Sequence, residues 1–139
     1  MAGETTALAA GSWRAANSIP TQGPAAALHT TTLSASFTTT DNQTNDVMEM
    51  GYLPEGITIV GVIVTATDMD TGGPTVVHKI TVGSTDILTG LTNAGTGATT
   101  FNPLPTPYKT AAYDLVKVTS TTAATTAAAG TLSLRFVYF

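Results

Sequence analysis

The closing stretch Thr131-Leu132-Ser133-Leu134-Arg135-Phe136-Val137-Tyr138-Phe139 decides the fold class. Its large apolar side chains recur at every second residue, and Ser133 and Arg135 stand between them. Successive side chains of an extended strand point to opposite faces of a sheet, so this spacing predicts a half-buried β-strand. Since the strand carries aromatic residues and no polar tail follows it, we expect it to lie inside a sheet and to be required for the domain to close.

The same period of two recurs in earlier parts of the chain, with runs of apolar residues separated by polar turns. We expect strands at residues 28–38, 48–52, 57–65, 75–83, 113–120 and 131–139. Residues 84–90 could form one helical turn. Three prolines within residues 101–108 favour an extended surface segment without ladder hydrogen bonds. With two shorter extended pieces, roughly seven or eight strands predict an all-β, single-domain β-sandwich of the jelly-roll or Greek-key type.

One of these strands, residues 57–65, is apolar on both faces. Strict alternation places Ile57, Ile59 and Ile63 on one face and Val60, Val62 and Val64 on the other. One face must meet the core, and a bare valine stripe on the other would promote aggregation. We therefore assign Val60, Val62 and Val64 to an interface, with either a second layer of the same chain or a neighbouring subunit.

The first 27 residues show no sustained period and are dominated by small residues. We expect an extended N-terminal arm at residues 1–27, joined to a sandwich domain at residues 28–139, and a disordered terminus is the equal alternative. Tryptophan and arginine are enriched at the anchoring centres of interfaces. Trp13, Arg14 and Ile19 are accordingly the interface candidates in this arm.

The composition excludes several classes of partner and site. Only 10% of the residues are charged, the formal net charge is −4, and Lys and Arg do not cluster, so we expect neither nucleic acid nor membrane as a partner. The chain has no cysteine, which removes disulfides and thiolate chemistry. The longest apolar run, residues 57–64, is too short to span a bilayer. No export signal is legible, which indicates synthesis in the cytoplasm.

The two histidines, His29 and His78, are the first candidates for acid–base or metal chemistry. Neither has a neighbouring His, Cys or Glu at ligand spacing, so we expect structural roles for both. No nucleophile elbow, phosphate loop or dinucleotide fingerprint occurs in the sequence. We therefore expect a protein that is not an enzyme and that has no catalytic residue, cofactor or metal.

The segment Asp68-Met69-Asp70-Thr71-Gly72-Gly73 begins like a calcium-binding loop. Gly72 takes the third acidic position, however, and Lys79 replaces the glutamate that closes such a loop, so the EF-hand interpretation fails. A tight polar turn between strands is the favoured interpretation. A loose surface cation at Asp68 and Asp70 is the alternative.

Three segments, residues 53–60, 68–75 and 121–132, together resemble the small structural proteins of tailed phages known as decoration or head-stabilisation proteins. The resemblance covers roughly residues 53–139 and lies in the order of elements. It implies a β-sandwich that binds the phage major capsid protein on the outer surface of the mature head, often as a homotrimer, and stabilises contacts between capsomers. The implied location is the virion, after synthesis in the host cytoplasm.

A second class of function stays open, because β-sandwiches serve many functions. The chain could be a head-fibre, tail or adhesin-type module that binds a host surface or glycan. Exposed aromatic residues clustered in loops would favour this alternative, and Tyr108 and Tyr113 are its candidates.

Overall fold

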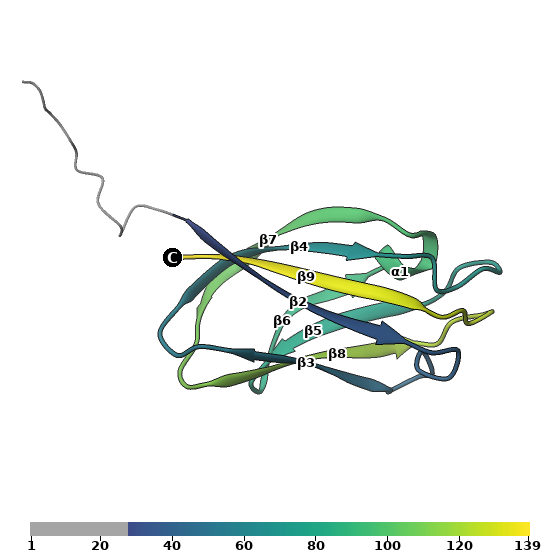
Figure 1. Ribbon diagram of the computed structural model, residues 1–139, viewed down its shortest axis with the longest axis horizontal. Helices are drawn as coiled ribbons and strands as arrows, with labels where there is room; N and C mark the ends of the chain where they lie inside the picture. The colour runs from purple at the N-terminus through teal and green to yellow at the C-terminus, as the bar shows by residue number, and fades with distance from the viewer. Residues whose placement is uncertain (1–27) are drawn as a thin grey trace, which may run out of the picture.

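The computed structural model describes residues 28–139, in which eight strands form two packed antiparallel sheets (Figure 1). In chain order the strands are β2 (His29–Phe37), β3 (Val47–Leu53), β4 (Thr58–Ala66), β5 (Val77–Val82), β6 (Thr85–Leu91), β7 (Thr99–Lys109), β8 (Asp114–Thr122) and β9 (Gly130–Tyr138). The predicted all-β, single-domain β-sandwich is confirmed. The expected arm, with Trp13, Arg14 and Ile19, lies outside the described residues, so its interface role stays a prediction.

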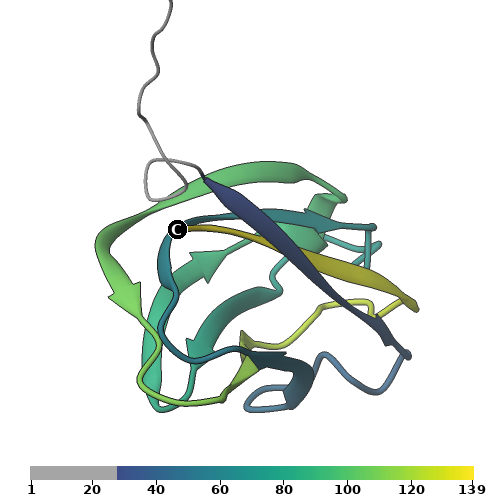
Figure 2. The ribbon, with the colours of Figure 1, turned by 60° about the vertical axis from the view of Figure 1, so that its left-hand side comes forward.

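The chain passes back and forth between the two sheets. The β9 sheet has the order β2-β9-β4-β7, and the β8 sheet has the order β3-β8-β5-β6. Every connection between consecutive strands passes from one sheet to the other, except that β5 and β6 are neighbours in one sheet. Consecutive strands therefore mostly lie in opposite layers of the sandwich. Figure 2 shows the two layers, with the β9 sheet along the upper side of the view.

Strand β9 lies inside its sheet, as the alternation at the end of the chain predicts. It pairs with β2 along one side and with β4 along the other, so that Leu134 stands opposite both Leu33 and Val64. Leu134 and Phe136 are fully buried between the sheets. The last strand therefore contributes a central part of the core, which lies between the two sheets and receives side chains from all eight described strands.

A β-bulge in β4 corrects the assignment of Val62 and Val64 to an interface. The register with β7 and β9 jumps from Ile59 to Gly61, so Val60 is an extra residue that has no partner. One extra residue reverses the side-chain direction of everything that follows it. Ile59, Val62 and Val64 consequently all point into the core, with relative exposures of 0%, 0% and 1%. Val60 is partly buried at the bulge, and an interface role for it stays a prediction.

Two other local predictions differ from the structure. Residues 84–90 do not form a helical turn, because Ile87 and Leu91 face the core when the segment pairs with β5 as strand β6. The helix is instead α1 (Asn93–Thr96), and in residues 28–139 no helix is long and apolar enough to cross a membrane. The proline-rich segment pairs with β4 at both ends, and only residues 104–107 between them bulge out of the ladder.

Replacement of a side chain at the centre of the β9 sheet tests this packing. We expect Phe136→Ala to lower the free energy of unfolding by about 3–5 kcal/mol, because it removes a fully buried aromatic ring and leaves a cavity. Phe139→Ala is the matched control, since that ring is 52% exposed and its loss is expected to cost less than about 1 kcal/mol. Urea denaturation followed by circular dichroism gives both values. Equal losses in the two variants would contradict the central position of β9.

Candidate functional site

His78 is buried inside the domain, where its side chain is hydrogen-bonded to another buried side chain. Its side chain is 2% exposed, and its Nε2 lies 2.9 Å from Oδ1 of Asn42. The same Asn42 oxygen accepts a hydrogen bond from Oγ of Ser120, at 3.1 Å. Burial lowers the pKa of His78 to about 4, so the ring is neutral at pH 7. Because Asn42 Oδ1 is an acceptor, we assign the ring proton to Nε2.

This polar cluster joins three parts of the chain that are distant in sequence. Asn42 belongs to the β2–β3 connection, whereas His78 and Ser120 stand opposite each other on β5 and β8. The backbone oxygen of Asn42 also accepts a hydrogen bond from the N–H of Ala124, at 2.9 Å. Nothing in the local sequence around Asn42 distinguishes a buried asparagine from an exposed one, so this position could not be predicted from the pattern. None of the three side chains is accessible to a substrate, since each is at most 2% exposed.

Asp70 is the second buried polar group, with a relative exposure of 1%. Its Oδ2 accepts hydrogen bonds from the backbone N–H groups of Thr75 (2.7 Å), Val76 (3.2 Å) and Thr125 (3.1 Å), and its Oδ1 accepts one from Thr126 (2.8 Å). Burial by itself would raise the pKa of Asp70. The four N–H donors outweigh burial and lower the pKa to about 2.

These hydrogen bonds give a structural role to the acidic residues of the loop that begins like a calcium site. Both carboxylate oxygens of Asp70 are directed at protein N–H groups, and Asp68 Oδ1 accepts the backbone N–H of Asp70 at 3.0 Å. Within residues 28–139 no group of three or more His, Asp or Glu residues could hold a metal ion. The carboxylate thus ties the β4–β5 connection to the β8–β9 connection, which agrees with the polar-turn interpretation.

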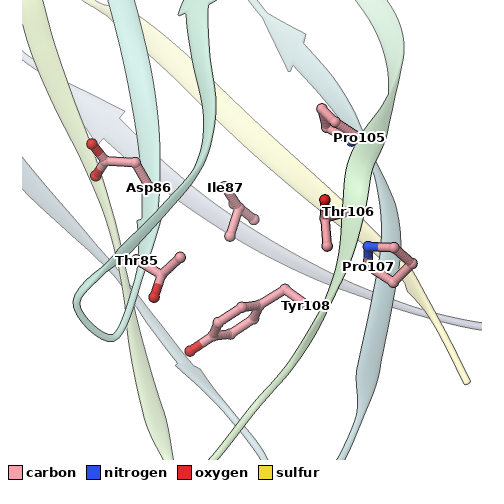
Figure 3. Close-up of a pocket in the computed structure, with 7 residues that line it drawn as sticks. All are labelled: Thr85, Asp86, Ile87, Pro105, Thr106, Pro107 and Tyr108. Atoms are coloured by element: carbon pink, nitrogen blue, oxygen red, sulfur yellow. The ribbon is translucent and has the colours of Figure 1, made fainter.

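A groove runs between the edge strands β6 and β7 (Figure 3). It contains two adjacent cavities of about 260 and 290 Å³. The first is lined by Thr85, Asp86, Ile87, Pro105, Thr106, Pro107 and Tyr108. Its carboxylate is already engaged, because Asp86 accepts hydrogen bonds from Thr81 Oγ1 (2.8 Å) and Lys79 Nζ (3.2 Å), which lower its pKa. Prolines provide no N–H groups for pairing with a further strand, so this lining protects the β7 edge from such pairing.

Two exposed tyrosines stack against each other on the outer side of the β8 sheet. The rings of Tyr52 and Tyr113 have centroids 5.1 Å apart and planes 12° apart, and they are 53% and 69% exposed. The sequence predicts Tyr113 as an exposed aromatic residue together with Tyr108, but Tyr108 is partly buried and donates a hydrogen bond to Asp114 Oδ2 at 3.3 Å. Tyr52 was not predicted, because strict alternation places this residue on the core face. A bulge at Met50 turns Tyr52 outward.

The outer face of the β9 sheet carries an exposed phenylalanine held against a glycine. Phe101 on β7 is 57% exposed, and its ring lies over Gly61 of β4. A Cβ atom at position 61 would lie only 2.6 Å from Cε1 of Phe101, so the close approach requires glycine. The same face has a hollow of about 180 Å³, lined by Thr32, Ile63, Thr65, Thr99, Ser133 and Arg135.

Replacement of Asp70 tests whether its carboxylate holds the β4–β5 and β8–β9 connections together. We expect Asp70→Asn to lower the free energy of unfolding at pH 7 by about 1–3 kcal/mol, because an amide loses acceptor capacity for buried N–H groups. The pKa of the folded state is below the ordinary 3.8, so this stabilisation is complete above pH 3.8 and is lost as pH falls toward 2. Urea unfolding at pH 7 and pH 2 should show the difference between variant and wild type shrinking. Glu55→Gln, at an exposed acid, is the control, and a pH-independent difference for Asp70→Asn would contradict the assignment.

His78 predicts a second pH dependence. Its pKa is about 4 in the folded state against 6.5 ordinarily, so below pH 6.5 the unfolded state takes up a proton that the folded state does not. The stability should therefore be full above pH 6.5 and fall by roughly 3 kcal/mol as pH decreases to 4. Unfolding free energies at pH 7.5 and 4.5 should show this slope in wild type and in His29→Gln, but not in His78→Gln. The same slope in all three proteins would exclude His78 as its source.

The chain matches no known protein family and none of the curated proteins compared with it. Among the solved structures that contain similar chains are two phage capsids. A chain of the cyanophage Pam1 capsid asymmetric unit aligns with a TM-score of 0.71 and 22% identity, over 95% of this chain and 98% of that one. A chain of the capsid of Ralstonia phage GP4 aligns with a TM-score of 0.66 and 21% identity, over 86% of this chain and 88% of that one. At these identities the similarity establishes a shared β-sandwich fold.

Proposed function

We propose that this protein is a structural component of a tailed-phage head that binds the outer surface of the mature shell and stabilises contacts between capsomers. The observation that carries the proposal is the nearly complete alignment with chains of two phage capsid structures. Because the alignments span most of both chains, the similar chains are of comparable length. The resemblance of residues 53–139 to decoration proteins supports the same function.

The proposed role is non-enzymatic and needs no cofactor. In the described part of the chain, the polar groups with displaced pKa values serve the fold or are already paired: His78 is buried and Asp70 binds backbone N–H groups. The proposed partner is the phage major capsid protein. The proposed location is the outer surface of the virion, after synthesis in the host cytoplasm.

The proposed mechanism is the addition of several modest contacts. A homotrimer would link three copies of one contact, so that its avidity exceeds the affinity of any single copy. Binding to the mature shell alone would stabilise that state by mass action. The decorated shell would then withstand the internal pressure of packaged DNA, and no covalent bond between the protein and the shell would be needed.

One observation favours the alternative of a module that binds a host surface or glycan. The stacked pair Tyr52 and Tyr113 is a rigid, exposed aromatic surface. Tyrosine provides large contact areas at low cost in side-chain entropy, which suits recognition. The pair is consistent with a ligand-binding role, but it involves a small part of the molecule.

Sedimentation of the purified protein, alone and mixed with emptied, expanded phage heads, tests the proposed function. We expect a trimer that pellets with heads at a fixed ratio to the major capsid protein. Heads that lack this protein should assemble normally and should release DNA at lower temperature than complete heads. A monomer that stays in the supernatant would overturn the decoration role, and heads of equal thermal resistance would overturn the stabilising role.

A further inference from the structure

The outer faces of the two sheets differ in their charge. The β8 sheet has four charged side chains on its outer face, and they occur as neighbouring pairs of opposite sign. They are Glu49, Lys79, Asp86 and Lys117. Lys79 and Asp86 form an ion pair of 3.2 Å, and Glu49 stands directly opposite Lys117. This face has the composition of a surface in contact with water, because burial of these pairs would require their desolvation.

The strands of the β9 sheet contain only two charged residues, Arg135 in the middle and Lys109 at the end of β7. The rest of the outer face is mostly threonine and serine, with a few apolar residues. Such side chains cost little to desolvate in comparison with charged ones. Interface centres are depleted of charged residues in general, with arginine as the exception. By this criterion the β9 sheet is the face that can be covered by another protein.

Four side chains form one row across this face. The register places Thr32 opposite Arg135, Arg135 opposite Ile63, and Ile63 opposite Phe101. We call these four residues the Arg135 row. Arg135 is exposed and forms no ion pair with another described residue, and the hollow of about 180 Å³ lies beside it. The row therefore combines an aromatic residue and an arginine, two kinds of side chain that dominate binding energies at interfaces.

The aromatic end of the row is fixed before any partner binds. Gly61 allows the ring of Phe101 to lie close to the sheet, while 57% of its surface is in solvent. A side chain that is already ordered loses less entropy on binding. Leu28 and Phe139, which are 63% and 52% exposed, add further apolar surface at one end of the same sheet.

The positive charge of Arg135 distinguishes between the two kinds of partner that could bind this face, a second copy of the chain or a different protein. Two copies joined face to face about an axis near the Arg135 row would bring Arg135 near Arg135, and the strands β2, β4, β7 and β9 contain no Asp or Glu to compensate. A different protein surface that presents a carboxylate would satisfy the guanidinium, which binds carboxylates in a bidentate manner. On the proposed function, from which this inference follows, that surface belongs to the capsid shell.

We propose that the outer face of the β9 sheet, centred on the Arg135 row, docks on a flat and mainly uncharged patch of the capsid shell that offers a carboxylate to Arg135. The β8 sheet then faces the solvent. The two layers in Figure 2 correspond to these two roles, with the docking sheet along the upper side of the view.

Binding of purified variants to emptied, expanded heads tests this orientation. Arg135→Glu and Phe101→Ala should each raise the concentration for half-saturation at least about tenfold in co-sedimentation, because they remove the arginine and the aromatic anchor. The matched controls are Lys117→Glu and Tyr113→Ala, which likewise reverse a positive charge and remove an aromatic ring, but on the β8 side. Both controls should stay within about twofold of wild type. Urea unfolding of each variant verifies that it folds.

The outcomes separate this inference from the proposed function. Wild-type protein that does not bind heads overturns both. Wild-type binding that is unaffected by Arg135→Glu and Phe101→Ala overturns the docking face alone, and so does a loss of binding that occurs only in the two controls. If Arg135→Glu instead dissociates the oligomer of the free protein, the β9 sheet is a contact between copies and the inference is wrong.

Discussion

Two of the extra residues in the ladders, Val60 in β4 and Met50 in β3, determine which side chains of these two strands reach the solvent. Side chains alternate between the faces of a strand, so one inserted residue reverses every side chain after it. In β4 the bulge directs Val62 and Val64 into the core. In β3 the bulge turns Tyr52 outward, where it stacks on Tyr113. The composition of both outer faces therefore depends on these two positions.

The connections at one end of the sandwich are held by buried polar groups. The carboxylate of Asp70 binds four backbone N–H groups from two connections, and Asn42 binds His78 and the β8–β9 connection. Buried polar groups stabilise a fold when their partners are complete, and an incomplete set is costly. Asp, His, Ser and Asn are residue types that also occur in catalytic sites. Here, however, their hydrogen bonds are made to other groups of the same domain. These buried groups cannot contact a partner, whereas the outer faces of the two sheets can.

The two proposed functions become compatible when the orientation of the molecule is considered. A protein that docks through the β9 sheet would present its β8 sheet to the outside of the head. The tyrosine pair and the ion pairs lie on that side, so they would stay accessible after docking. Binding to the shell and binding of a ligand by Tyr52 and Tyr113 would then use opposite faces of one sandwich. Assembly on the head would determine how many such pairs are displayed together.

The amino-acid sequence by itself determined the fold class and the inner position of the last strand. Alternation is a local property, and it is readable at residues 28–38 and 131–139 because each strand buries one side only. Only the tertiary structure determined where the bulges lie, that most of residues 84–90 belong to strand β6, and that the Arg135 row forms. The members of that row are joined by register between strands far apart in the chain. Register depends on pairing with distant strands, which no local pattern records, and so Val62 and Val64 were assigned to the wrong face while Arg135 and Phe101 were missed.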